Sequence, residues 1–412
     1  MISFHEARNK MLEGIKSLPS EKCPLAGLLG RVLAQDVTAS FDIPPRDNSA
    51  MDGFAVIASD IAEATEQSSV TLQIIEDVPA GKVATKSLKP GQAIRIMTGA
   101  QVPEGADAVV PVELTEGKLQ PFDKLRVHEK CKILQAVKQG ANIRKQGEDV
   151  KAGQSLIPKG TRLRPQEVGL IASLGLTDVL VYKQPVVGVL SSGNEIADPG
   201  QPLKPGQIYD ANRFSVAGQV NEAGAKVNDY GIVPDDLSSI KDALNKASQE
   251  CDVIITSGGV SVGDYDLMKQ ALSELGSMNF WQVKQKPGKP LAIGHINGKP
   301  VIGLPGNPVS SMVVCDQYVR PLLLKMQGCR DIFKKPISAV CDQDIRKQSG
   351  RTEFLRAKVE WRDGGYHAML TGPQGSGILT SMVQADGLMI LQEECEGVKP
   401  GDLVQVELFS QE

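Results

Sequence analysis

The sequence predicts a multidomain protein in which a central α/β domain with a parallel sheet lies between a mixed α+β N-terminal region and a C-terminal all-β domain. Three observations lead to this fold class. The 412 residues are too many for one compact core. Residues 178–329 alternate β-branched runs with amphipathic helical patterns, which is typical of a parallel sheet. Residues 330–412 change to strand-like runs around a hairpin turn signal.

Residues 1–177 mix strand-like runs with short helical ones, and glycine and proline interrupt them often. Ser3 precedes Glu6 by three residues, a spacing that predicts a capping box and a helix start. The segment "RPQEVGLIASLG" predicts another helix, with Pro165 in its first turn and Gly175 as its end.

The central part contains three short β-branched runs, at residues 186–190, 252–256 and 301–304. Helical spacing follows them, and the helix from about Ala211 has Asp210 as a candidate N-cap, with Phe214, Ala217 and Val220 on one face. Further helices are expected near residues 237–247, 267–275 and from 309 onward. We therefore expect a parallel sheet covered by helices on both faces.

The C-terminal part contains "RTEFLRAKVEWRDGGYHAML", which predicts two strands around the turn Asp363-Gly364-Gly365. The runs "GLMILQE" and "DLVQVELF" add further strands. A small barrel or sandwich is expected from residue 330 to the end.

Composition excludes several functional classes. No apolar run approaches the ~18 residues of a membrane span, and an early acid, Glu6, argues against a signal peptide. The formal net charge of -4 argues against nucleic acid as a partner. Seven dispersed cysteines without a C-x-x-C pair favour reduced thiols in a cytoplasmic protein over disulfides or structural zinc.

Three polar, glycine-bearing loops follow predicted strands, at residues 191–195, 257–264 and 305–308. In open parallel sheets, ligands bind beyond the carboxyl ends of the strands. Glycines let backbone N–H groups approach a ligand, and helix N-termini attract anions. The loops therefore predict a site for a phosphate-bearing small molecule, although many such turns need glycine for geometry alone.

Acidic residues gather near the same loops, and they are Glu195, Asp235, Asp236, Asp264 and Asp266. Carboxylates beside phosphate favour Mg²⁺ between them. Helix capping is the alternative for Asp235, Asp236 and Asp266. In "KPGKP", Lys286 and Lys289 could bind phosphate as point charges, or they could simply form an exposed charged turn. No histidine has metal-ligand spacing, and no nucleophile motif indicates covalent catalysis.

The chain resembles the MoeA and gephyrin E-domain family, the molybdopterin molybdenumtransferases. The resemblance is carried in order by "DNSAMDGFAV", "IRIMTGAQVPEGADAVV", "RKQGEDV", "IASLG", "SSGNE", "QIYDANR", "TSGGVSVGDYD", "KPGKPLAIG", "GLPGNPVSS", "SGR" and "QGSG". These segments extend from Asp47 to Gly377, so the resemblance covers nearly the whole chain.

The resemblance implies a homodimer with four domains per subunit. Residues 1–177 would form two interleaved domains, residues 178–329 the molybdopterin-binding α/β domain, and residues 330–412 a β-barrel-like domain. The implied active site lies between the α/β domain of one subunit and the N-terminal region of the other. The implied reaction hydrolyses adenylylated molybdopterin with Mg²⁺, places molybdate on the dithiolene and releases AMP.

The same resemblance assigns roles to residues of this sequence. Glu195, Asp235 and Asp266 would hold Mg²⁺, and Lys286 and Lys289 would bind phosphate. The catalytic residues Asp52, Thr98 and Asp149 would act from the partner subunit. The remaining substrate-binding residues would be Ser257, Gly258, Gly259, Ser261, Pro305, Pro308, Arg351 and Ser376. Arg351 and Ser376 would face the molybdate oxygens, to which an arginine fork and a hydroxyl are suitable donors. Gly377 departs from family members that carry a larger polar residue there, which puts molybdate affinity in question.

Two other functions fit parts of the sequence. A related family of molybdopterin adenylyltransferases shares the central α/β domain, but it lacks the flanking regions that this chain carries. Gephyrin uses the same domains as a scaffold that clusters receptors, and a partner surface of that kind, or one for other proteins of the cofactor pathway, is compatible with the sequence. An assay for production against consumption of adenylylated molybdopterin separates the two enzymes, and pull-down experiments test the scaffold.

Overall fold

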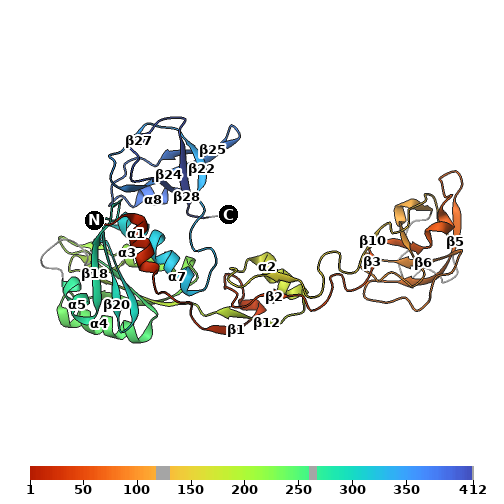
Figure 1. The fold of residues 1–412 in the computed structure, drawn as a ribbon, viewed down its shortest axis with the longest axis horizontal. Helices are drawn as coiled ribbons and strands as arrows, with labels where there is room; N and C mark the ends of the chain where they lie inside the picture. The colour runs from red at the N-terminus through yellow and green to blue at the C-terminus, as the bar shows by residue number, and fades with distance from the viewer. Residues whose placement is uncertain (117–129, 259–266, 411–412) are drawn as a thin grey trace. The chain divides into compact units, whose positions relative to one another are not determined.

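The computed structural model describes residues 1–116, 130–258 and 267–410. The chain forms two compact units (Figure 1). The first unit comprises residues 1–35, 159–172 and 176–412, and the second comprises residues 36–158 and 173–175. The chain therefore leaves the first unit after Gln35 and re-enters it at Lys159.

The central sheet of the first unit has the strand order β16-β13-β17-β21-β20-β18. Strands β13 (Val186–Ser192), β16 (Lys226–Val233), β17 (Val253–Ser257) and β21 (Lys299–Leu304) are parallel, as predicted. Strands β20 (Pro290–Ile296) and β18 (Ser277–Gln282) extend the sheet in antiparallel orientation, which the strand–helix alternation did not predict. The turn between β20 and β21 contains Asn297 and Gly298, both with positive φ, which is the usual composition of a tight hairpin turn.

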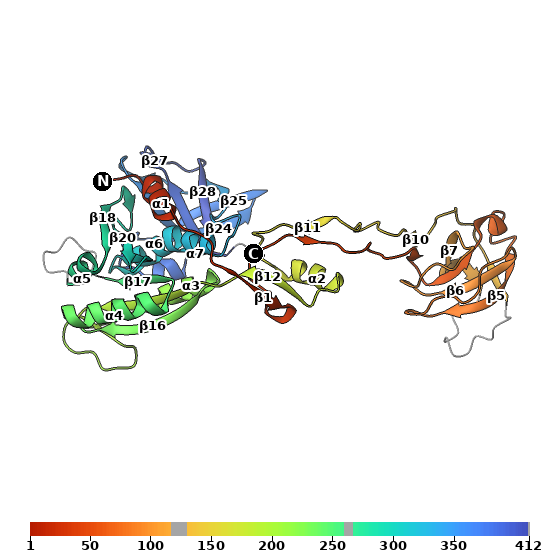
Figure 2. The same ribbon diagram turned by 60° about the horizontal axis from the view of Figure 1, so that its bottom comes forward.

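Helices cover both faces of this sheet, as predicted (Figure 2). On one face, Val187 and Val189 pack against α3 (Asn212–Glu222) and the helical segment formed by α6 (Pro308–Val314), a π-helical turn (Cys315–Val319) and α7 (Arg320–Met326). On the other face, Leu190 packs against α4 (Leu237–Glu250) and α5 (Leu267–Leu275). The alternation of β side chains between two faces explains why these strands are apolar throughout.

Helix α3 differs from its predicted apolar face. Phe214 is 51% exposed, whereas Val216 and Val220 are buried against the sheet. Asp210 accepts a hydrogen bond from the N–H of Arg213 at 3.1 Å and so satisfies an amide of the first turn, but the N-cap position of α3 is the next residue, Ala211.

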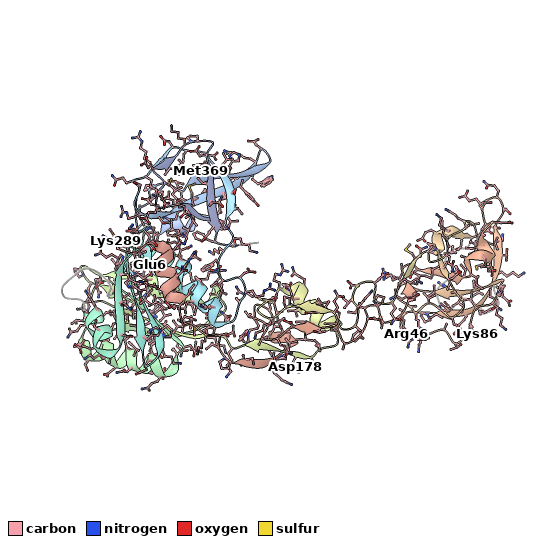
Figure 3. All side chains as sticks on the ribbon, viewed as in Figure 1. Glu6, Arg46, Lys86, Asp178, Lys289 and Met369 are labelled. Carbon is pink, nitrogen blue, oxygen red and sulfur yellow. The ribbon has the colours of Figure 1, made fainter. Side chains whose placement is uncertain are left out.

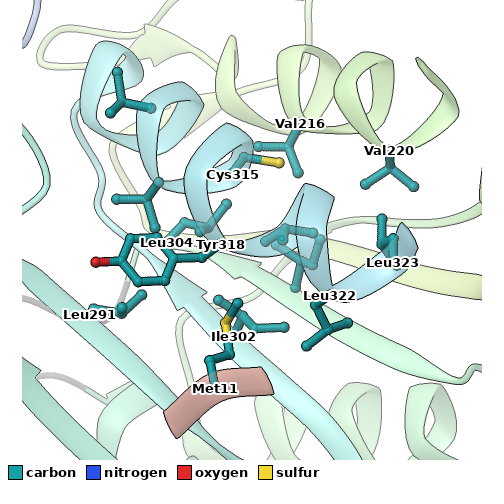
Figure 4. Packing of buried hydrophobic residues seen from close by; sticks show 14 of the residues in the cluster. Met11, Val216, Val220, Leu291, Ile302, Leu304, Cys315, Tyr318, Leu322 and Leu323 are labelled. Atoms are coloured by element: carbon teal, nitrogen blue, oxygen red, sulfur yellow. The ribbon is translucent and has the colours of Figure 1, made fainter. Parts of the chain in front are cut away.

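Helix α1 (Phe4–Leu12) packs against the α/β domain rather than against the strands that follow it. Ser3 accepts a hydrogen bond from the N–H of Glu6 at 3.1 Å, as its spacing predicts. Phe4 makes edge-to-face contacts with Tyr318 and Phe354, and Met11 reaches the cluster around Ile302 and Tyr318 (Figure 4). One apolar core thus includes α1, the α/β domain and three residues of the C-terminal domain, Phe354, Met382 and Leu388.

The C-terminal domain is a closed barrel. Strands β24 (Thr352–Arg362), β25 (Gly365–Leu370), β22 (Ile337–Cys341), β28 (Leu403–Leu408) and β26 (Gly387–Leu391) pair in a ring that returns to β24. The predicted hairpin turn is present between β24 and β25, where Asp363 and Gly364 have positive φ. Strand β19 (Gln285–Lys286) of the α/β domain adds to β24 in parallel. Shorter elements are β23 (Ile345–Arg346), β27 (Gly397–Val398) and α8 (Thr380–Val383).

A small layer of the first unit consists of β1 (Ser20–Pro24), β12 (Asp178–Tyr182) and α2 (Pro165–Ser173).

The second unit contains a sheet of order β7-β4-β6-β5-β9-β8. Its strands are β4 (Gly53–Val56), β5 (Val70–Val78), β6 (Gln92–Ile96), β7 (Ala108–Pro111), β8 (Thr115–Glu116) and β9 (Lys130–Ile133). The two-residue strand β3 (Asn48–Ser49) pairs with β10 (Ile143–Arg144), and β2 (Val37–Thr38) pairs with β11 (Ser155–Ile157).

Candidate functional site

A cavity of about 580 Å³ lies between the carboxyl ends of the parallel strands and the C-terminal barrel. Glu195 follows β13, Gly258 follows β17, and Pro305 follows β21. The barrel contributes Arg351 before β24 and a loop after β25. The full lining is Glu195, Gly258, Gln285, Lys286, Pro287, Gly288, Lys289, Pro290, Pro305, Gly306, Asn307, Ser310, Arg351, Gln374, Gly375 and Ser376.

Among the described residues, the lining of this cavity carries more positive than negative charge. It has the cations of Lys286, Lys289 and Arg351 and the carboxylate of Glu195. Lys286 Nζ lies 3.4 Å from both carboxylate oxygens of the largely buried Glu353. Lys289 is exposed (Figure 3), and neither it nor Arg351 has an ion pair among the described residues. Two cations in a concave site that no described carboxylate neutralises favour an anionic ligand.

The loop that carries both lysines is held by buried polar contacts that the sequence did not indicate. Gln285 is fully buried; it accepts the hydroxyl hydrogen of Tyr318 at 2.5 Å and donates to the carbonyl of Gly288 at 2.8 Å. Gly288 has a φ of +84°, and a Cβ there would lie 2.5 Å from Val314. Only glycine therefore fits at the centre of the Lys286–Lys289 loop without displacing its neighbours.

The barrel side of the cavity is fastened to the start of α6. The backbone N–H of Val309 donates to the carbonyl of Ser376 at 3.1 Å. Asn307 Nδ2 donates to the hydroxyl oxygen of Ser376 at 3.0 Å. Ser376, a predicted oxyanion contact, thus sits directly beside the loop after β21.

The predicted acids occupy different places. Glu195 lines the cavity, and its carboxylate packs against Gly193, where a Cβ would lie 2.6 Å away. Asp235 is exposed and is not among the lining residues. Asp236 accepts the N–H of Ser239 at 2.9 Å as the N-cap of α4, and hydrogen bonds from Ser239 lower its pKa. Asp236 is therefore a helix N-cap, which was the alternative to metal binding.

Several predicted site residues lie outside the described residues: Gly259, Ser261, Asp264 and Asp266. Within the part of the chain that the structure describes, no group of three His, Cys, Asp or Glu side chains is placed to hold a metal ion.

A smaller hollow of about 110 Å³ adjoins the cavity and shares Glu195, Gly258 and Gly306 with it. Ser257 and Pro308 line this hollow rather than the larger cavity. Its wall also includes Ile208 and Tyr209 of β15 (Ile208–Tyr209), which pairs with β14 (Ile196–Ala197). The hollow therefore combines apolar and polar walls beside the charged cavity.

Asp210 also borders this hollow, but its charge is compensated. The buried guanidinium of Arg213 contacts the carboxylates of Asp210, Asp229 and Asp198. These carboxylates help to keep the pKa of Arg213 above its ordinary value, against the opposing effect of burial. The cluster is a structural ion-pair network and leaves Asp210 no free charge for a ligand.

The second unit brings Asp52 and Thr98 together. Asp52 accepts hydrogen bonds from the backbone N–H of Thr98 at 2.7 Å and from its hydroxyl at 2.8 Å. These bonds hold the pKa of Asp52 below its ordinary value. Asp149 is exposed, and its N–H donates to the carbonyl of Ile43 at 3.1 Å.

Known families and relatives match this chain from its first residues to its last strands. Three family models match successive parts of the chain: the MoeA N-terminal region (domain I and II) at residues 2–175, a probable molybdopterin binding domain at 188–325, and the MoeA C-terminal region (domain IV) at 338–409. A molybdopterin molybdenumtransferase of Haemophilus influenzae is 38% identical over 416 residues, covering 100% of this chain and 99% of the relative. The chain belongs to the MoeA family.

Other MoeA relatives agree along the full length. A molybdopterin molybdenumtransferase of Bacillus subtilis is 37% identical and covers 100% of this chain and 95% of its own. The crystal structure of the molybdopterin biosynthesis moeA protein from Pyrococcus horikoshii superposes with a TM-score of 0.84 at 34% identity, covering 99% of this chain and 100% of that one.

Membership places the chain among transferases of molybdenum cofactor biosynthesis. In this MoeA protein the cavity lies where the segment matched by the molybdopterin-binding model meets the segment matched by the MoeA C-terminal model. Among the described residues, no helix is both long and apolar enough to cross a membrane.

Proposed function

We propose that the protein hydrolyses adenylylated molybdopterin in the presence of Mg²⁺ and ligates molybdate to the dithiolene, releasing AMP. The observation that supports this most is that Lys289 and Arg351 line the cavity without an ion pair to any described residue, together with the carboxylate of Glu195. Both the pyrophosphate of the substrate and molybdate are anions, and cations in a concave site bind such groups. The curated relatives from Haemophilus influenzae and Bacillus subtilis carry the name molybdopterin molybdenumtransferase.

The proposed chemistry consists of a hydrolysis and a ligand exchange. Water adds to the phosphoanhydride, its P–O–P bond breaks, and the products are AMP and molybdopterin, which keeps its own terminal phosphate. Each dithiolene sulfur then forms a bond with molybdenum. The two thiol protons leave with one molybdate oxygen as water, so no oxidant or reductant is needed. Lys286 and Lys289 would hold the phosphates, and Arg351 and Ser376 would hold the molybdate oxygens.

Glu195 is the described residue suited to Mg²⁺. Its carboxylate lines the cavity, and none of its oxygens is used in an ion pair among the described residues. Mg²⁺ commonly binds one or two protein carboxylates together with substrate phosphates and water, so this donor set fits. When bound, the ion would neutralise phosphate charge. Asp235 and Asp266 stay predictions as further ligands.

We further propose that the enzyme is a cytoplasmic homodimer and that Asp52, Thr98 and Asp149 act at the site of the partner subunit. All seven cysteines are free, as a reducing compartment favours. Asp52 and Thr98 form one hydrogen-bonded pair at the surface of the second unit. An exposed carboxylate that two hydrogen bonds hold in a fixed orientation suits a group that meets a ligand or metal.

The function is tested by single turnover with purified protein, adenylylated molybdopterin, molybdate and Mg²⁺. We expect AMP release together with molybdenum bound to pterin, and loss of both when Mg²⁺ is chelated. Lys358→Gln, an exposed charge change on the barrel, serves as the control and should match the wild type. Synthesis of adenylylated molybdopterin from ATP, with no consumption, would instead identify an adenylyltransferase.

The shared site is tested by complementation. Asp52→Ala and Lys289→Ala should each lower activity, whereas verified heterodimers of the two should recover part of it because one hybrid site keeps both residues. Heterodimers that remain as inactive as their parents would refute a site built from two subunits.

A further inference from the structure

Arg356 carries a buried charge that the proposed mechanism does not use. It lies on β24 and is 1% exposed, and burial lowers its pKa. Among the described residues no carboxylate forms an ion pair with its guanidinium. Because burying a charge without a counter-ion is costly, a residue of this kind calls for an explanation.

Two of the three side-chain hydrogen bonds of Arg356 lead to the barrel loop that lines the cavity or to its continuation, and the third goes from Nη1 to the carbonyl of Phe354 on the same strand at 3.5 Å. Its Nη2 donates to the carbonyl of Gly375 at 3.2 Å, and its Nε donates to the hydroxyl of Ser381 at 3.1 Å. Its backbone N–H donates to Gln374 Oε1 at 2.8 Å, and its carbonyl accepts from Gln374 Nε2 at 3.2 Å. Arg356 thus holds the loop through its side chain and through both of its backbone groups.

The other end of the same loop is fixed to the α/β domain. Ser376 accepts hydrogen bonds from Val309 N–H and from Asn307 Nδ2. Gln374, Gly375 and Ser376 all line the cavity. The loop is therefore held between Arg356 on the barrel strand and the start of α6, with its cavity-lining residues in between.

We propose that Arg356 is a positioning residue for the oxyanion part of the cavity: its guanidinium fixes the Gly375–Ser376 peptide and thereby places Ser376. The peptide is planar and trans, so a bond to the Gly375 carbonyl also fixes the N–H of Ser376, which points the opposite way. A charged donor makes a stronger hydrogen bond than a neutral one. The inference rests on the proposed function, in which Ser376 contacts molybdate.

Loop order and anion binding are measured separately on the full-length protein. The variants are Arg356→Met, which removes the charge and the donors, and Arg356→Lys, which keeps the charge and one donor group. Lys358→Gln is the control, because it changes an exposed charge on the same strand. Hydrogen exchange of residues 371–378 reports loop order. Equilibrium dialysis with molybdate reports affinity, and thermal unfolding confirms that each variant is folded.

We expect Arg356→Met to exchange faster than the wild type over residues 371–378 and to bind molybdate about tenfold more weakly. Arg356→Lys should recover part of both properties. A double-mutant cycle then separates positioning from general stability: in a Ser376→Ala background Arg356→Met should cost no further affinity, whereas in a Lys289→Ala background it should keep its full effect.

Unchanged exchange over residues 371–378 in Arg356→Met would overturn the inference, as would full additivity with Ser376→Ala. If Arg356→Met does not fold, the comparison of Arg356→Lys with the wild type decides by the same two measurements. If the wild type binds no molybdate, the oxyanion part of the proposed function fails, and the exchange measurement still decides whether Arg356 orders the loop.

Discussion

The side-chain amide of Asn307 donates a hydrogen bond to the hydroxyl oxygen of Ser376 at 3.0 Å. This bond joins the loop after the last parallel strand to the barrel, so the cavity wall is made by both domains together. The Ser376 hydroxyl accepts from Asn307, which leaves its own hydrogen free to be donated to a ligand oxygen.

We therefore predict that Ser376→Ala weakens molybdate binding by about 1.5–3 kcal/mol, the usual contribution of a hydrogen bond to a charged group. The free energy of unfolding should change little, because Ser376 is only partly buried. Isothermal titration with molybdate measures the effect. Ser338→Ala removes another barrel hydroxyl, one that accepts a bond from Gln405 away from the cavity, and should bind like the wild type. Equal affinities for Ser376→Ala and Ser338→Ala would contradict the prediction.

The two cavity lysines should respond differently to removal. Lys289 has no ion pair among the described residues, whereas Lys286 faces Glu353. Lys289→Ala should weaken molybdopterin binding more than Lys286→Ala and should reduce its salt dependence. Lys286→Ala should instead lower the melting temperature more, because it leaves the buried Glu353 carboxylate unpaired.

Fluorescence titration at several salt concentrations and thermal unfolding measure these two effects. Lys226→Ala is the matched control, since Lys226 is exposed at the first residue of β16, the end opposite the cavity. The prediction would be wrong if Lys286→Ala weakened binding more than Lys289→Ala and Lys289→Ala lowered the melting temperature more than Lys286→Ala.

Gly288 should be required for the shape of the lysine loop. Gly288→Ala introduces a methyl group 2.5 Å from Val314, whereas Gly298→Ala at a similar positive φ meets nothing within 4 Å. Both variants lose the conformational freedom of glycine, so their difference isolates the clash. We expect Gly288→Ala to be less stable than Gly298→Ala by about 1–3 kcal/mol, measured by urea unfolding. Equal stabilities would mean that α6 can move away from the added methyl group without loss of stability, which would contradict the prediction.

The pKa of Asp52 should depend on Thr98. The backbone N–H of Thr98 and then its hydroxyl lower this pKa, and Thr98→Val removes only the hydroxyl. The pKa of Asp52 should therefore rise while it stays below its ordinary value. Carboxyl carbon NMR titration measures it. Asp42, whose pKa is lowered chiefly by the N–H of Ala152, should titrate identically in both proteins.

The sign of the linked stability follows from that shift. A carboxyl group with a lowered pKa in the folded state stabilises the fold above its unfolded pKa. In both proteins the contribution starts to fall near the unfolded pKa and is gone once the pH is below the folded pKa. Because Thr98→Val has the higher folded pKa, its contribution should be smaller than in the wild type and should be lost completely at a higher pH. A melting temperature that falls more steeply with acid in Thr98→Val than in the wild type would contradict this assignment.

Residue patterns predicted the layers of the α/β domain well because they report local contacts. Val187, Val189 and Leu190 form a run without polar alternation, and such a run fits only a strand buried on both faces. The antiparallel strands β18 and β20 were missed, although Asn297-Gly298 is a hairpin signal. That turn signal lies within residues 178–329, where the alternation of strand and helix patterns predicted parallel strands joined by helices.

The cavity could be predicted only where it follows strand ends. Strands β13, β17 and β21 are neighbours in the sheet, so the loops that carry Glu195, Gly258 and Pro305 meet. Asp235 follows β16, which is the outermost strand beyond β13, and it does not reach the lining. The roles of Gln285 and Arg356 were not predicted from the sequence, because their partners Tyr318 and Gly375 lie in other elements and no periodic pattern connects them.

The contact of Phe4 with Tyr318 and Phe354 has a consequence for how the chain is made. Phe4 is synthesised well before Tyr318 and Phe354, and the aromatic rings that bury it emerge only after residues 318–354 have been translated. Until then the apolar side of α1 has no native partner. Contacts between residues that are far apart in the sequence slow folding, and apolar surface that stays exposed during this time is prone to aggregate. Closure of the shared core is therefore a late step in folding, and a chaperone that shields α1 until then should raise the yield of folded enzyme.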